Sequence, residues 1–86
     1  MMSETATHIE ILFFAGLKER LGERLRLPWE EGMTVEKVME TLKAMAPELE
    51  PFLNHTMVAV NETYATRQTQ LHVGDRVAFI PPVSGG

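Results

Sequence analysis

Apolar and polar residues alternate along several short segments of the chain, which is typical of β-strands with two unlike faces. In residues 8–14 the odd-numbered positions are uniformly apolar, whereas the even-numbered positions mix polar and apolar residues. We therefore expect the odd-numbered row to face the core. Shorter strands are predicted at 24–28 with one solvated face, at 57–60 as a buried strand, at 63–65 as an edge strand, and at 76–80.

A helical pattern follows the second predicted strand. Apolar residues recur at helical spacing between a threonine in the N-cap position and a proline that ends the pattern. This pattern predicts one main helix over residues 34–46. A shorter helical turn is predicted over residues 15–21, closed by Gly22. Residues 48–55 contain a further proline and are expected to form a connection.

The order of these elements indicates the fold class. The first two strands can form a hairpin, and the last strand can lie parallel to the first because a crossover helix separates them. The sequence therefore predicts an α+β fold, with a mixed sheet of four to five strands packed on one main helix. We divide the chain into a leader at residues 1–7, a domain at residues 8–80, and an extended tail at residues 81–86.

Composition excludes several classes of function. The 86 residues make one domain, and a net charge of −4 with scattered basic residues argues against nucleic-acid binding. The absence of cysteine excludes disulfides, a cysteine nucleophile and thiolate metal sites, and it fits a reducing cytosol. No segment approaches the ~20 apolar residues of a membrane span, and the polar leader is unlike a signal peptide. We expect a cytoplasmic protein without a membrane partner.

Side chains offer little catalytic chemistry. The three histidines share no ligand spacing, so no metal site is expected. Neither serine lies in a nucleophile elbow, and no glycine-rich loop is present that could hold a nucleotide, so no bound cofactor is expected. If the chain takes part in chemistry, the reactive group is the terminal carboxylate rather than a side chain.

The end of the chain is suited to present that carboxylate. Pro81 and Pro82 favour a stiff, extended spacer, and Gly85 and Gly86 make the last stretch thin enough for a narrow channel. A frayed terminus, or a glycine scar left by cloning, is the alternative explanation of the glycines alone. A carboxylate must be activated before attack, for example by ATP to an acyl-adenylate. The activated acyl group can then accept sulfur, which gives a thiocarboxylate on a chain that has no cysteine.

Four segments together resemble a known family. They are Ile11–Ala15, Val58–Asn61, Gly74–Phe79 and Pro81–Gly86. The chain is similar, from about residue 9 to its end, to the MoaD-like small sulfur-carrier subunits of molybdopterin synthase, in the MoaD/ThiS family of ubiquitin-like β-grasp proteins. A Gly-Gly end is shared by every carrier of this fold. The Phe-Phe-Ala opening together with Pro-Pro-Val-Ser-Gly-Gly is more specific to the MoaD-like members.

The resemblance implies a reaction cycle in which the chain has no active site of its own. An E1-like, MoeB-like adenylyltransferase would activate Gly86 with ATP, and a sulfurtransferase system would supply sulfur. The thiocarboxylated tail would then enter a MoaE-like large subunit and donate sulfur to precursor Z, twice for each dithiolene. The synthase would be a heterotetramer with two copies of each subunit. The leader departs from the family, in which the first strand begins almost at once.

Strand alternation and the resemblance together predict the site. Gly86 would be the reacting residue and Gly85 its thin neighbour. The outward row of the first strand ends at Phe14, and that of the last strand ends at Ile80. Tyr64 on the edge strand extends this surface. These three residues, and Pro81, Pro82, Val83 and Ser84 of the tail, are predicted to contact partners. The alternative for Phe14 is that it covers the edge of the core beneath a loop.

Other functions remain open at this point. A carrier for thiamine synthesis, cysteine synthesis or tRNA thiolation would use the same terminal chemistry, although thiamine carriers usually lack the Phe-Phe-Ala and Pro-Pro-Val signature. A ubiquitin-like modifier would instead form an isopeptide bond with lysines of target proteins. A plain β-grasp interaction module would have no carrier role.

Overall fold

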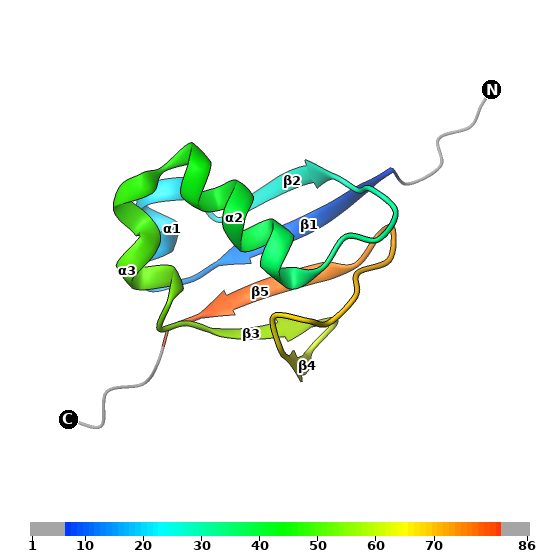
Figure 1. Ribbon diagram of the computed structural model, residues 1–86. Helices are drawn as coiled ribbons and strands as arrows, with labels where there is room; N and C mark the ends of the chain where they lie inside the picture. The colour runs from blue at the N-terminus through cyan, green and yellow to red at the C-terminus, as the bar shows by residue number, and fades with distance from the viewer. Residues whose placement is uncertain (1–6, 82–86) are drawn as a thin grey trace.

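A mixed sheet and the helices that lie against it make two layers (Figure 1). The structure, a computed structural model, describes residues 7–81. Helix α2 crosses one face of the sheet, and α1 and α3 lie at the end of the sheet where β1 and β5 finish (Figure 1). The elements in chain order are β1 (His8–Phe13), α1 (Ala15–Leu21), β2 (Arg24–Pro28), α2 (Val35–Met45), a 3-10 turn (Pro47–Leu49), α3 (Glu50–Leu53), β3 (Met57–Val60), β4 (Thr63–Ala65) and β5 (Arg76–Ile80).

The five strands lie in the order β2-β1-β5-β3-β4. Strand β1 pairs antiparallel with β2 and parallel with β5, and Ile11 lies opposite Val77 in the parallel pair. Strand β3 pairs antiparallel with both β5 and β4. This arrangement confirms the predicted α+β class, the mixed sheet and the parallel pairing of the first and last strands.

The inward rows of the central strands form the core beneath α2. Phe13 of β1 and Phe79 of β5 are each at most 1% exposed, and their rings stack with centroids 6.5 Å apart. Val38 and Leu42 of α2 are fully buried against this layer. The odd-numbered row of β1 therefore faces the core, as the alternation predicts.

Helix α2 begins where the sequence indicates. Thr34 is the N-cap, and its hydroxyl oxygen accepts a hydrogen bond of 3.3 Å from the backbone N–H of Lys37. The helix ends at Met45, one residue before the predicted limit, with Ala46 as the C-cap. No helix within residues 7–81 is long and apolar enough to cross a membrane.

The prediction of a connection over residues 48–55 is wrong. A 3-10 turn is followed directly by α3, and each begins with a proline in its first positions. Proline is tolerated there because the first N–H groups of a helix have no intrahelical acceptor. Leu49 and Leu53, four residues apart, are fully buried, so this segment belongs to the core.

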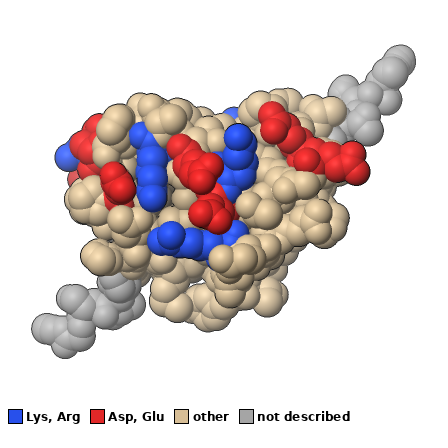
Figure 2. Space-filling view, viewed as in Figure 1, with Lys and Arg blue, Asp and Glu red and all other residues tan. Residues whose placement is uncertain are grey.

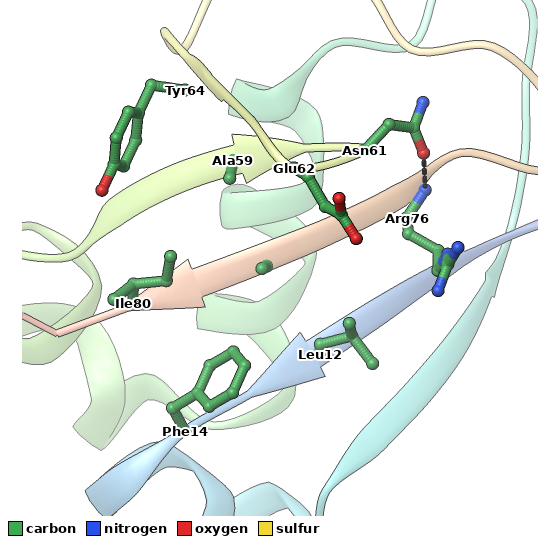
Figure 3. Close-up of a pocket in the computed structure, with 9 residues that line it drawn as sticks. Leu12, Phe14, Ala59, Asn61, Glu62, Tyr64, Arg76 and Ile80 are labelled. Atoms are coloured by element: carbon green, nitrogen blue, oxygen red, sulfur yellow. Dashed lines mark hydrogen bonds between the residues drawn. The ribbon is translucent and has the colours of Figure 1, made fainter.

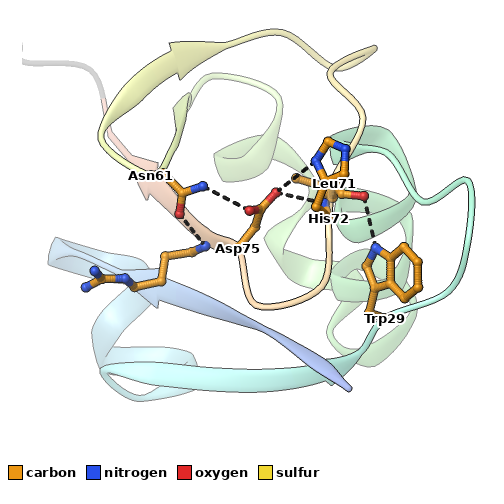
Figure 4. Close-up of polar contacts among 6 residues, drawn as sticks. Trp29, Asn61, Leu71, His72 and Asp75 are labelled. Carbon is orange, nitrogen blue, oxygen red and sulfur yellow. Dashed lines mark hydrogen bonds and ion pairs between the residues drawn. The ribbon is translucent and has the colours of Figure 1, made fainter. Parts of the chain in front are cut away.

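A group of polar contacts, here called the polar clasp, fixes the β3–β4 turn to the start of β5 (Figure 4). Asn61 and Glu62 have φ of 51° and 70°, the left-handed values of a tight two-residue hairpin turn. The Asn61 amide donates to an Asp75 carboxylate oxygen at 2.9 Å, and its carbonyl oxygen accepts from the Arg76 N–H at 3.0 Å. Asp75 also accepts from the N–H of His72 at 2.8 Å.

Candidate functional site

The face of the sheet opposite α2 carries a hollow of about 370 Å³, here called the sheet hollow (Figure 3). The predicted residues Phe14, Tyr64 and Ile80 all line it: Tyr64 lies on β4, Ile80 on β5, and Phe14 directly follows β1. Phe14 is 46% exposed and Tyr64 is 69% exposed. The remaining lining residues are Leu12, Ala59, Asn61, Glu62, Arg76 and Ala78.

Strand register explains why this face is hollowed. Ala59 of β3 lies opposite both Tyr64 and Ala78, in adjacent strand pairs. The two alanines make a low floor, because their side chains are the smallest on the face. Leu12 of β1 lies opposite Ala78 on the other side, and the larger residues Phe14 and Tyr64 rise around the floor. The arrangement leaves a shallow, largely apolar hollow, a kind of surface that often marks an interaction site.

Phe14 is a surface residue rather than a cover for the core edge. Strand β1 ends at Phe13, and Phe14 keeps an extended backbone, with φ −131° and ψ 158°, as the N-cap residue of α1. The alternation of the strand therefore continues through one more residue and directs Phe14 to the open face. Its role in binding stays a prediction.

A second hollow of about 410 Å³ lies between α1 and α3. Phe14 lines this hollow as well as the sheet hollow, and Pro81 forms part of its wall. Its lining also includes Pro51 and Phe52 of α3, and Phe52 is 51% exposed. Ile80 lines the first hollow and Pro81 the second, so the tail starts at the border of two apolar surfaces.

Two exposed apolar residues near the start of the tail, Met57 and Phe52, are not predicted from the sequence. Met57 is expected in a buried strand, yet it is 47% exposed and lies opposite Ile80 on the open face. Alternation with the buried Val58 is the signal that could have found it. Phe52 has no such signal, because the segment around it is predicted to be irregular.

The tail itself lies almost entirely beyond the described structure. Strand β5 ends at Ile80, as predicted, and Pro81 is the last described residue. The predictions for Pro82, Val83, Ser84, Gly85 and Gly86 fall outside the described residues and stay predictions.

The described part of the chain offers an open, largely apolar surface beside the start of the tail. Within residues 7–81, no group of three or more histidine and acidic side chains is placed to hold a metal ion. The core of this part contains no buried polar or charged residue. What the arrangement can do chemically is bind an apolar partner surface beside the start of the tail.

Sequence comparison assigns the chain to a family. The profile of the ThiS family matches residues 11–86. The chain belongs to the ThiS family. A relative from Arabidopsis thaliana, named molybdopterin synthase sulfur carrier subunit, is 34% identical over 83 residues, which are 95% of this chain and 86% of that protein. The predicted family is therefore confirmed, and the match extends from β1 through the Gly-Gly end.

Solved structures confirm the ubiquitin-like β-grasp fold of this ThiS-family chain. SAMP1 from Haloferax volcanii is 30% identical to this chain, with a TM-score of 0.80. The superposition covers 92% of this chain and 99% of SAMP1. A chain from the complex of subunits 1 and 2 of the molybdopterin-converting factor of Helicobacter pylori is 24% identical, with a TM-score of 0.65 and coverage of 92% and 99%. At that identity the second likeness supports the fold alone.

Proposed function

We propose that this chain is the sulfur-carrier subunit of a molybdopterin synthase. The observation that supports this most is the position of an open apolar face at the start of a Gly-Gly tail. This arrangement occurs in a ThiS-family chain that matches a named sulfur-carrier subunit over 95% of its length. The sheet hollow docks the partner, and the tail brings the terminal carboxylate to the partner's active site.

The reaction takes place at Gly86. A carboxylate oxygen attacks the α-phosphorus of ATP, which releases pyrophosphate and leaves an acyl-adenylate. Sulfur at the oxidation level of sulfide then displaces AMP and forms the C–S bond of the thiocarboxylate. The thiocarboxylate sulfur is transferred to precursor Z, and water restores the terminal carboxylate. This chain binds no cofactor in the cycle, because the ATP is bound and used by the activating enzyme.

The dimensions of the tail suit this role. The six residues from Pro81 to Gly86 span up to about 20 Å when extended. The partner can therefore dock on the sheet hollow while its active site lies well away from the sheet. Gly85 and Gly86 add no Cβ atom, so the last residues fit a channel that would exclude other residues.

The proposal includes two successive partners. One is an E1-like, MoeB-like adenylyltransferase, and the other is a MoaE-like large subunit, with which two carriers form a heterotetramer. A partner of the second kind is supported by the Arabidopsis thaliana relative, which is named as a subunit of molybdopterin synthase. The proposed setting is the cytoplasm.

Reconstitution tests the proposal. The chain, the adenylyltransferase and large subunit of the same organism, ATP, a sulfide source and precursor Z should together produce molybdopterin. The matched control is the same mixture with a chain that lacks Gly86. Product formation that does not require the complete tail, or no product from the complete mixture, would contradict the proposal.

A protein modifier is the second candidate function. It is favoured by the 30% identity with SAMP1, whose class is named small archaeal modifier protein. A modifier would leave a remnant of its own C-terminus on lysines of target proteins; trypsin cleaves after Arg76, so the remnant would be residues 77–86. Mass spectrometry of the host proteome, compared with a strain that lacks this chain, distinguishes the two functions.

A further inference from the structure

The open face of the sheet has a second, charged half. Three outward positions of this half hold arginines, here called the arginine end: Arg26 and Arg76 lie level with Glu10, at the end away from the tail, and Arg24 lies nearer the middle, opposite Leu12. Glu10 of β1 lies opposite Arg26 on one side and opposite Arg76 on the other. Three of the eight basic residues of the chain therefore lie around one carboxylate.

Neighbouring acids do not balance these arginines. Glu10 accepts a 3.1 Å hydrogen bond from the guanidinium of Arg24. Arg26 and Arg76 are exposed and form no ion pair with another side chain of residues 7–81. Glu62 lies at the same end of the sheet hollow as Arg76 (Figure 3). Two of the three guanidinium groups thus have no ion-pair partner among residues 7–81, on a chain whose net charge is −4.

The helix-covered face differs in its charge pattern. There, positive and negative side chains lie close together over much of the surface, and a group of acidic side chains lies at the right of the view (Figure 2). The local excess of positive charge on the sheet face therefore does not follow from a uniform distribution of charge over the molecule.

We propose that the arginine end binds carboxylates of the partner protein that occupies the sheet hollow, and thereby sets the orientation in which the tail is delivered. The inference rests on the proposed function, because it assumes that a partner docks on this face. Arginine is suited to the role, since its planar guanidinium forms paired hydrogen bonds with a carboxylate. Three arginines are too few for a nucleic-acid backbone on a chain of net charge −4.

The apolar and charged halves are continuous. Leu12 of the sheet hollow lies opposite Arg24 on β2 and opposite Ala78 on β5. One partner surface that covers the hollow therefore also reaches the arginines. Arg76 and Ile80 are four residues apart on β5, which is about 13 Å along the strand. The partner should therefore carry acidic residues about 13 Å from the entrance that receives the tail.

The charged half adds something that an apolar hollow does not. Apolar contact is not directional and tolerates rotation or sliding of the partner, whereas charge pairs at one end fix the register. Charge pairs also raise the rate of association, and this effect falls with added salt.

A pair of variants with the same change in net charge tests the inference. Arg26→Glu combined with Arg76→Glu changes the arginine end, and Lys37→Glu combined with Lys43→Glu changes α2 on the opposite face. Association with the purified large subunit of the same organism is followed by stopped-flow fluorescence at low and high salt. The arginine variant should associate about tenfold more slowly at low salt, and the deficit should shrink near 1 M salt, where the Debye length is about 3 Å.

The lysine variant should associate within about threefold of the unmodified chain, because its charges lie away from the interface. Equal rates for the two variants would overturn the inference, since only net charge would then matter. Failure of the unmodified chain to bind the large subunit would instead contradict the proposed function. If the glutamate variant melts at a much lower temperature, Arg26→Ala with Arg76→Ala replaces it, compared with Lys37→Ala and Lys43→Ala.

Discussion

Phe14→Asp separates the docking role of the sheet face from its contribution to folding. A phenylalanine side chain has about 200 Å² of surface. With 46% exposed, roughly 90 Å² of Phe14 is free to be covered by a partner. At 25 cal/mol per Å² this contact contributes about 2.3 kcal/mol, or about 50-fold in Kd. Aspartate also places a charge in the apolar interface, so the loss should be at least this large.

The same variant should lower stability by a limited amount. The covered part of Phe14 is roughly 110 Å², which sets an upper limit of about 2.7 kcal/mol for the loss in unfolding free energy. Binding is measured by titration calorimetry with the large subunit, and stability is measured by denaturant unfolding. Both measurements use the same preparation.

Phe79→Leu is the control for a loss of stability alone. Phe79 is fully buried on the opposite face of the sheet, so this change should cost about 1–2 kcal/mol of stability through imperfect packing. Its Kd should remain that of the unmodified chain. The reasoning is refuted if Phe14→Asp remains folded and binds normally, or if Phe79→Leu weakens binding as much as Phe14→Asp does.

Three further predictions concern the tail and the polar clasp. Deletion of Gly86 should leave the melting temperature unchanged but abolish adenylation, measured as ATP–pyrophosphate exchange, because the carboxylate moves back by about 3.5 Å. Gly85→Ala should fold normally and slow sulfur transfer to the pterin in a single-turnover assay; an unchanged rate would show that the partner's channel accepts a Cβ. Asn61→Ala should cost about 1–3 kcal/mol of stability in denaturant unfolding, since it removes the hydrogen bonds to Asp75 Oδ1 and to the Arg76 N–H and places alanine at positive φ. Asn61→Gly loses the same hydrogen bonds but tolerates the positive φ, so it should cost less.

Strand faces can be predicted from the sequence because the side-chain period of a strand is two. The odd-numbered row of β1 and the residues Val77 and Phe79 of β5 are apolar, and the structure buries them. The open face follows from the same alternation, which places Phe14 and Ile80 in the outward rows of the first and last strands. Main-helix limits follow from periodicity and the Thr34 cap.

Other features depend on contacts that a local pattern does not contain. Pro47 and Pro51 are helix breakers in an interior but suitable residues in a first turn, and only the burial of Leu49 and Leu53 decides between these roles. The hollow itself requires the register that brings Ala59 and Ala78 together. The arginine end likewise arises from the pairing of β1 with both β2 and β5, since its three arginines lie on two strands that are far apart in sequence.

The central claim is that sulfur is carried on the carboxyl terminus, and intact-mass measurement tests it most directly. The protein should be isolated from host cells that lack the large subunit, so that the thiocarboxylate accumulates instead of being consumed. The account predicts a mass increase equal to the replacement of one terminal oxygen by sulfur, localised to Gly86 by fragmentation and absent from cells that lack the adenylyltransferase. A terminus that carries only oxygen in cells that lack the large subunit but contain the adenylyltransferase would contradict the account.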